Sequence, residues 1–174
     1  PPHARRRRLA PLVCSFSCAL PPLVGSALPL DGARRGITGL SMGGRGALVH
    51  ALRIPEFWKS VSAFAPIVHP SAVPWGEKAF TAYLGDDRAT WRAYDAVCML
   101  EDGLRHPTTI LVDQGDADPF LECELQPWHL QNAARAACQH LTLRRPAAYA
   151  HSYWFVQSFA CEHPRHHAAI LGAL

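Results

Sequence analysis

The residues that most clearly indicate reactive chemistry lie in the turn 39–44, whose sequence is Gly-Leu-Ser-Met-Gly-Gly. This turn contains the pattern G-x-S-x-G, with an apolar run at 36–38 before it and a helix-like stretch at 45–53 after it. A strand that reverses sharply into a helix presents the apical serine as a nucleophile, and glycines let the two elements approach closely. We therefore predict that Ser41 is a catalytic nucleophile and that the amide of Met42, at the helix N-terminus, binds an oxyanion. The alternative is a glycine-rich turn with an ordinary serine.

A serine nucleophile needs a base to accept its proton and a carboxylate to orient that base. The buried strand expected at 108–112 leads to Asp113, Asp116 and Asp118, and His151 follows the next strand. Sites of parallel sheets lie at the carboxyl ends of the strands, and the order Ser–Asp–His is that of α/β-hydrolases. We select Asp118 as the acid because it lies deepest in its loop, keep Asp116 as the second choice, and expect Asp113 to order the turn. The alternative for His151 is a half-buried imidazole between two tyrosines.

Three histidines near the C-terminus and six cysteines are the candidate metal ligands of the sequence. His163, His166 and His167 share a helix face, a spacing that also occurs among metal ligands. They have no cluster of cysteines or carboxylates beside them apart from Glu162, so we expect a solvated or capping helix end. The six cysteines form no C-x-x-C pair and match no zinc spacing. They indicate free thiols in a reducing compartment, and we expect no metal site.

The composition is that of one globular domain. The chain has 174 residues, of which 49 % are hydrophobic and 18 % are charged, so it can form a buried core. Its formal net charge is +3, and the run 5–8 contributes four arginines to that value. Without this run the remaining sequence is close to neutral, which disfavours a nucleic-acid-binding surface.

The first thirty residues differ from the rest of the chain. The segment 1–8 is rich in proline and arginine, and the apolar stretch 9–30 contains four prolines, which argue against a membrane helix. We predict an irregular, disordered or artefactual segment at 1–30; a targeting signal is the alternative. Residues 31–174 are predicted to form the folded domain.

From residue 31 onward strands alternate with helices, which predicts an α/β fold with a parallel sheet covered on both faces. Strands are expected at 35–40, 61–65, 108–112 and 140–144, and helices at 43–53, 77–84, 90–100, 126–139 and 153–171, the last of them kinked at Pro164. The stretch 71–75 is expected to be a loop on the rim of the Ser41 edge. This position makes Trp75 a candidate substrate-binding residue.

Several stretches in this order resemble the S-formylglutathione hydrolase family, also called esterase D. They are Gly-Leu-Ser-Met-Gly-Gly-Arg-Gly-Ala-Leu at 39–48, the segments 59–67, 74–80, 83–85 and 91–96, Asp113-Gln114-Gly115 with Asp118 and Phe120, and the segments 151–153 and 165–168. The resemblance covers about residue 28 to the C-terminus. It implies the α/β-hydrolase fold, with Ser41, Asp118 and His151 as nucleophile, acid and base.

The resemblance also implies a function. A member of this family hydrolyses the small-molecule thioester S-formylglutathione to formate and glutathione, as part of formaldehyde detoxification in the cytoplasm. No metal or redox cofactor is needed, and neither nucleic acid nor a membrane is expected as a partner. Two alternatives remain open: a general carboxylesterase or acyltransferase of the same fold, and a catalytically impaired truncated fragment.

The sequence departs from the family pattern at several points. It has Leu40 and Arg45 where the family usually has histidines, and Ala150 where the family has an aspartate. It also lacks resemblance to the upstream family segment that carries the early strands and a second oxyanion amide. We therefore expect only the C-terminal half of the sheet, with an exposed edge strand unless the segment 12–20 pairs with it. An exposed edge favours association, with a homodimer as one outcome.

Overall fold

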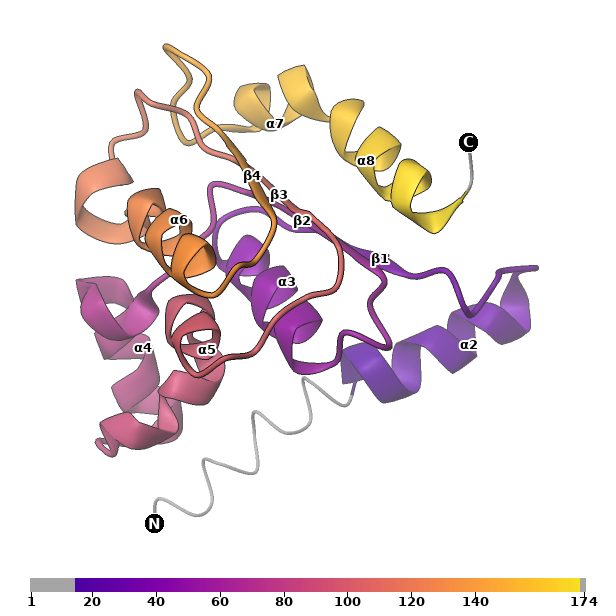
Figure 1. Ribbon diagram of the computed structural model, residues 1–174, viewed down its shortest axis with the longest axis horizontal. Coiled ribbons are helices and arrows are strands. Elements are labelled where there is room, and N and C mark those ends of the chain that lie inside the picture. Colours follow the sequence, from indigo (N-terminus) through magenta and orange to yellow (C-terminus); the bar gives the residue numbers. More distant parts are fainter. Residues whose placement is uncertain (1–14, 173–174) are drawn as a thin grey trace.

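The computed structural model describes residues 15–172, which form a parallel sheet with helices on both faces (Figure 1). Within these residues the sheet has four strands in the order β1-β2-β3-β4, with all neighbours parallel. The strands are β1 (Gly36–Ile37), β2 (Ser60–Phe64), β3 (Ile110–Asp113) and β4 (Leu141–Arg144). The α-helices are α2 (Leu20–Ala27), α3 (Met42–Arg53), α4 (Pro74–Leu84), α5 (Ala96–Glu101), α6 (Pro127–Ala136), α7 (Tyr153–Phe159) and α8 (Glu162–Leu171). Short π or 3-10 turns span Ser15–Ala19, Pro70–Ala72, Arg88–Thr90, Arg92–Tyr94 and Leu121–Leu125.

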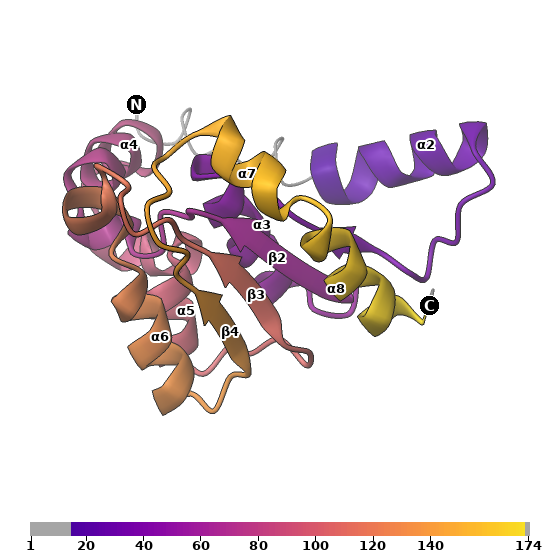
Figure 2. The same ribbon diagram turned by 90° about the horizontal axis from the view of Figure 1, so that it is seen from above.

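The layers follow from the alternation of strands and helices. Helices α3, α5 and α6 cover one face of the sheet, and α7 and α8 cover the other (Figures 1 and 2). Every residue of β2 and β3 is buried, as expected for central strands of a parallel sheet. The predicted α/β fold with about four parallel strands is confirmed.

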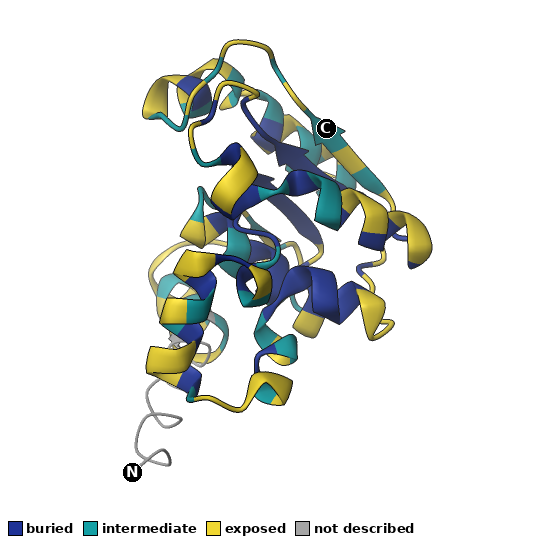
Figure 3. Cartoon of the chain, turned by 90° about the vertical axis from the view of Figure 1, so that its left-hand side faces the viewer, coloured by how far each residue is buried: buried dark blue, intermediate teal, exposed yellow. Residues whose placement is uncertain are grey.

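The main core lies between the sheet and the helices α3, α5 and α6. Leu48 and Leu52 of α3 meet Ile110 of β3 and Leu130 of α6 there, and each of these four side chains is at most 2 % exposed. Figure 3 shows the central strands and the inner faces of the helices in dark blue. This apolar layer fixes α3 against the sheet, and the position of α3 fixes the turn at its N-terminus.

The edge strand β1 is the least covered part of the sheet. It pairs with β2 and, among the described residues, with no other strand. Residues 15–27 are helical rather than irregular, since the prolines of α2 occupy its first turn, where a missing amide costs no hydrogen bond. No residue of α2 is buried. The part of the 12–20 segment that the structure describes therefore does not form a strand, and residues 1–14 lie outside the described residues.

Other predicted element boundaries differ from those in the structure. The stretch 71–75 is not a simple loop, because Pro74 starts α4 as its first residue. The expected helix at 90–100 is divided, since Asp95 adopts an extended backbone conformation and caps α5 with its side chain. The final helix is broken at Ala160 and Cys161, and Pro164 lies in the first turn of α8, where proline is tolerated. Across the described residues, no helix is long and apolar enough to span a bilayer.

Candidate active site

The turn between β1 and α3 holds Ser41 in a strained conformation. Its backbone has φ 57° and ψ −114°, a left-handed φ that a residue other than glycine rarely adopts. The Ser41 amide donates to the carbonyl of Phe64 at 2.8 Å, which fastens the turn to the end of β2. A Cβ atom on Gly39 would lie 2.4 Å from the backbone of Gly43, so only glycine fits at 39. This geometry is that of a nucleophile elbow.

The second close approach in the elbow is at Gly44 and not at Gly43, the second glycine of the G-x-S-x-G motif. A Cβ atom on Gly43 would meet nothing within 4 Å, whereas one on Gly44 would lie 3.1 Å from Pro66 and from the Gly39 carbonyl. Gly44 therefore allows α3 to pack against the chain that leaves β2. The sequence pattern predicted the need for small residues, and the structure assigns it to Gly39 and Gly44.

The amide of Met42 is the first of α3. Among the described residues it donates to no acceptor, and the Met42 side chain is 72 % exposed. Unpaired amides at a helix N-terminus carry a partial positive charge. The Met42 amide therefore suits an oxyanion that develops next to Ser41.

The histidine loop after β4 is joined to one aspartate of the acid loop. Nδ1 of His151 lies 2.6 Å from Oδ2 of Asp118, whose carboxylate is fully buried. Oδ1 of Asp118 accepts a hydrogen bond from the amide of Phe120 at 2.9 Å, and Oδ2 accepts one from Nε2 of Gln114 at 3.2 Å. The carboxylate is thus fixed from two sides and faces the imidazole.

The acid loop and the histidine loop are also joined through their backbones. A Cβ atom on Gly115 would lie 2.2 Å from the carbonyl oxygen of Tyr149, so glycine is required at this crossing. The Ala117 amide donates to the same carbonyl at 3.1 Å, and Asp116 accepts from the Ala148 amide. Asp116, the second choice for the acid, holds the two loops together and does not face His151.

Asp113 has a larger role than ordering its turn. It is fully buried at the end of β3, accepts two hydrogen bonds from Arg144, and accepts a third from His163 at 3.1 Å. Burial alone would raise the pKa of Asp113, but the hydrogen bonds from His163 and Arg144 lower it. Arg144 also pairs with Glu162, so this network ties α8 to β3 and β4.

The three C-terminal histidines are not a solvated helix end. His163 is 2 % exposed and stacks on Phe64 with ring centres 3.6 Å apart. His167 contacts the hydroxyls of Ser60 and Ser62 at 2.6 and 2.9 Å, and burial lowers its pKa to about 4. His166 lies 3.2 Å from the carbonyl oxygen of Val61. All three fasten α8 to β2, which the linear spacing did not reveal.

The carboxyl ends of β2, β3 and β4 lie at one edge of the sheet (Figure 2). The Ser41 amide bonds to the end of β2, and the loop with His151 follows β4. One apolar cluster connects the two regions, because Leu40, beside Ser41, packs with Phe64 and with Phe155 of α7. Within the described residues no hydrogen bond joins Ser41 Oγ to His151. Hydrogen bonds of an apo site are often long and shorten when substrate binds.

Trp75 lies on the same rim through a chain of aromatic rings. Its ring centre is 4.6 Å from that of Phe120, which is 5.5 Å from that of His151, and its side chain is 44 % exposed. The Trp75 amide donates to the buried carboxylate of Glu124 at 3.1 Å. The sequence indicated Trp75 as a candidate site residue. It indicated no individual role for Phe120, Gln114 or Glu124. Only the proximity of Gln114 to Asp118 in sequence could have indicated its contact.

The sheet order, the elbow and the three loops at one edge define an α/β-hydrolase fold. The family model described as "Putative esterase" matches residues 12–166, and the chain belongs to this esterase family. It is 51 % identical over 154 residues to the S-formylglutathione hydrolase of Paracoccus denitrificans (strain Pd 1222), covering 88 % of this chain and 54 % of that protein. The enzyme of that name from Rattus norvegicus is 44 % identical over 155 residues, with 88 % and 55 % covered.

A solved structure gives the same relationship. An S-formylglutathione hydrolase from Agrobacterium tumefaciens matches with a TM-score of 0.88 and 47 % identity, over 91 % of this chain and 57 % of that one. The chain thus spans about half the length of the relatives it matches.

Proposed function

We propose that this protein is a serine thioesterase that hydrolyses S-formylglutathione to formate and glutathione. The strained backbone of Ser41 at the start of α3 supports this proposal most directly, since a positive φ at a residue other than glycine is stored strain of the kind found at catalytic sites. The pair His151–Asp118 on the same sheet edge supplies a base with its orienting carboxylate. Identities of 44 to 51 % to proteins of that name support the choice of substrate.

In the proposed mechanism Ser41 Oγ attacks the formyl carbon while Nε2 of His151 takes the hydroxyl proton. The amide of Met42 donates to the oxyanion of the tetrahedral intermediate. When the intermediate collapses, the carbon–sulfur bond breaks, and the His151 proton passes to the glutathione sulfur. The product at this stage is formyl-Ser41 with free glutathione.

Hydrolysis of the formyl-enzyme repeats these steps with water. His151 takes a proton from water, the hydroxide adds to the formyl carbon, and the proton returns to Ser41 Oγ as formate leaves. Asp118 accepts the Nδ1 hydrogen throughout, which keeps Nε2 free as the base and stabilises the imidazolium when it forms. Trp75 and Phe120 offer apolar surface for the substrate on the rim.

The cellular setting follows from the proposed substrate. Formaldehyde detoxification supplies S-formylglutathione, and we propose that the protein acts in the cytoplasm on this small molecule. We also propose that residues 31–174 form the hydrolase domain. We also propose that the chain associates into a homodimer through the exposed edge of β1. A measurement of its molar mass in solution tests this association.

The test has two independent readouts on the purified chain. The first is the release of glutathione from S-formylglutathione, compared with the hydrolysis of a simple aryl acetate. The second is covalent labelling by a fluorophosphonate, which reacts with activated serines and reports the nucleophile even when turnover is slow. We expect labelling at Ser41 and preference for the thioester.

Matched variants make the result decisive. Ser41→Ala removes the nucleophile and is expected to abolish both readouts, whereas Ser158→Ala, at an exposed serine of α7, leaves both unchanged. Retained labelling in Ser41→Ala would exclude Ser41 as the nucleophile. Labelling at Ser41 with preference for the aryl acetate would leave the nucleophile standing and favour the general carboxylesterase instead.

A further inference from the structure

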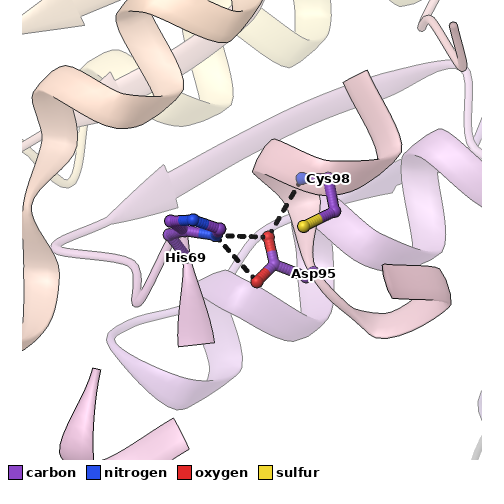
Figure 4. A group of neighbouring side chains, drawn as sticks. All are labelled: His69, Asp95 and Cys98. Atoms are coloured by element: carbon purple, nitrogen blue, oxygen red, sulfur yellow. Dashed lines mark hydrogen bonds and ion pairs between the residues drawn. The ribbon is translucent and has the colours of Figure 1, made fainter. Parts of the chain in front are cut away.

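A second group of side chains with catalytic or metal-binding chemistry lies outside the Ser41 edge. Figure 4 shows His69, at the start of the turn Pro70–Ala72, facing Asp95 and Cys98 at the start of α5. One ligand atom from each of the three residues lies within 4.8 Å of the other two. Asp95 is fully buried and Cys98 is 4 % exposed, while the His69 side chain keeps 18 % of its surface open to solvent.

The contacts leave one position where a cation would fit. Nδ1 of His69 lies 3.1 and 2.9 Å from the two carboxylate oxygens of Asp95, so a proton is held between imidazole and carboxylate. The thiol of Cys98 lies on the same side, 3.8 Å from the hydroxyl of Ser71. Imidazole nitrogen, carboxylate oxygen and thiolate sulfur are therefore directed at one small volume (Figure 4).

This donor set selects the class of ion. Nitrogen and sulfur ligands disfavour Mg²⁺ and Ca²⁺, whereas Zn²⁺ and its neighbours accept nitrogen, oxygen and sulfur together. Zinc-to-ligand bonds of about 2.0 to 2.3 Å place tetrahedral ligands roughly 3.4 Å apart. The His69–Asp95 contact then has to widen by about half an ångström. The His69 imidazole keeps 18 % of its side-chain surface open to solvent, which leaves room for this movement.

We propose that His69, Asp95 and Cys98 form a binding site for a borderline divalent cation of the Zn²⁺ class. Three protein ligands leave a fourth position open to water or to His129, whose ring centre lies 5.4 Å from that of His69. On binding, the Nδ1 proton of the imidazole and the thiol proton of Cys98 leave to solvent. The bound ion fastens the turn Pro70–Ala72 to α5 and takes no part in acyl transfer.

Linear spacing could not indicate this site. His69 and Asp95 are 26 positions apart, and Cys98 is separated from its partner Ser71 by 27. Short cysteine and histidine spacings indicate no metal site in this sequence, because His69 lies far from the other two donors along the chain. The three donors meet because Asp95 caps α5, which brings Cys98 to the same helical turn.

The experiment titrates the purified chain with Co²⁺ and Zn²⁺ alone. Cobalt bound to a thiolate gives a sulfur-to-metal charge-transfer band, and calorimetry with Zn²⁺ gives the stoichiometry. We expect the band to reach its maximum at one equivalent and Zn²⁺ to raise the thermal midpoint, because a ligand that binds the folded chain stabilises it. Absence of the band, or of the one-equivalent binding, overturns the proposal.

Variants assign the ligands. Cys98→Ser and Cys98→Val keep the volume of a small side chain, and both should remove the charge-transfer band, while His69→Ala should weaken Zn²⁺ binding at least about tenfold. Cys161→Ser, at an exposed thiol, is the matched control and should leave band and affinity unchanged. If both Cys98 variants fold and retain the band, or if Cys161→Ser removes it, the assignment to His69, Asp95 and Cys98 is wrong.

Discussion

Two histidines of this molecule each lie against a buried aspartate, and the two pairs are nearly indistinguishable as single contacts. His151 Nδ1 is 2.6 Å from Asp118 Oδ2, and His69 Nδ1 is 2.9 Å from Asp95 Oδ2. In both pairs the imidazole keeps 18 % of its side-chain surface exposed and the carboxylate keeps none. The contact alone therefore does not define a catalytic pair.

The difference lies in the other partners of each carboxylate. Asp95 also accepts hydrogen bonds from the amide and hydroxyl of Ser71 and from the amide of Cys98, so it joins a turn to a helix. Asp118 accepts instead from Gln114 and Phe120, both in its own loop. The first carboxylate stabilises the fold, whereas the second has few duties beyond orienting an imidazole at the elbow edge.

The hydrogen bonds at Asp95 also shift the pKa values of the His69–Asp95 pair. The hydrogen bond to Asp95, with a second one to Cys98, raises the pKa of His69 to about 10. Burial would raise the pKa of Asp95, and its bonds from His69 and Ser71 lower it. Before any cation binds, the His69–Asp95 pair is thus an ion pair at neutral pH and acts as a structural clamp between the turn Pro70–Ala72 and α5, and a bound cation would take the place of its proton.

The largest expected effect is the difference in activity between variants of the two aspartates. Asp118→Asn should lower kcat/KM, or the labelling rate of Ser41, by about 10⁴-fold, because an amide favours the wrong imidazole tautomer. Its thermal midpoint should change little. Asp95→Asn is the matched control, with a loss below about tenfold once folded protein is compared. Equal losses in the two variants would contradict the division of roles.

Stability should show the reverse order. Asp95→Asn disturbs the α5 cap and the charge that holds His69, so we expect a loss of about 2 to 4 kcal/mol in the free energy of unfolding. Asp118→Asn should cost less than half of that, because its partners lie in one loop. Urea denaturation of both variants and the parent chain provides the comparison. A more stable Asp95→Asn than Asp118→Asn would show that the clamp is misassigned.

The His151–Asp118 pair was predictable from sequence, and the His69–Asp95 clamp was not. Ser41 lies in a turn whose glycines are local signals, and Asp118 and His151 each follow a strand end, a position that parallel topology brings to one edge. The clamp depends on where a helix cap lies relative to a distant turn. The same holds for His163 and Asp113, which are 50 residues apart and meet only because α8 crosses the sheet.

His167, which contacts serine hydroxyls rather than a carboxylate among the described residues, is a reference for both histidine–aspartate pairs. Burial, with the charges of His166 and His163 nearby, lowers the pKa of His167 to about 4, so the folded chain holds this imidazole neutral. In the unfolded chain the His167 imidazole binds a proton near pH 6.5. The contribution of the neutral imidazole to the free energy of unfolding is therefore fully present above pH 6.5 and is lost as the pH falls towards 4.

We expect this loss to amount to about 1 to 3 kcal/mol between pH 6.5 and 4. His167→Gln keeps hydrogen-bonding groups for Ser60 and Ser62 but does not titrate. Subtracting its unfolding free energy from that of the parent chain at each pH isolates the imidazole. A difference that does not vary over this pH range would show that His167 has no lowered pKa.

The smallest expected effect concerns the partner that distinguishes Asp118 within its own loop. Gln114 is fully buried, and its Nε2 donates to the same oxygen, Oδ2, that accepts the Nδ1 hydrogen of His151. This second donor limits the rotation of the Asp118 carboxylate. Gln114 therefore helps to hold the carboxylate in the orientation that meets His151 in the proposed reaction.

Gln114→Met should lower kcat/KM by about threefold, because the Asp118 carboxylate loses one of the hydrogen bonds that fix its orientation. The fold should tolerate the change, because Oε1 of Gln114 has no hydrogen-bond partner among the described residues and its removal offsets the lost donor. Gln139→Met removes another buried glutamine, whose side-chain carbonyl accepts from the amide of His106, and serves as the control with an unchanged kcat/KM. An unchanged kcat/KM in Gln114→Met, with a normal thermal midpoint, would show that Gln114 does not position Asp118. A purely structural role for Gln114 would instead lower the midpoint and leave the kcat/KM of the folded protein unchanged, so the two measurements together separate positioning from stability.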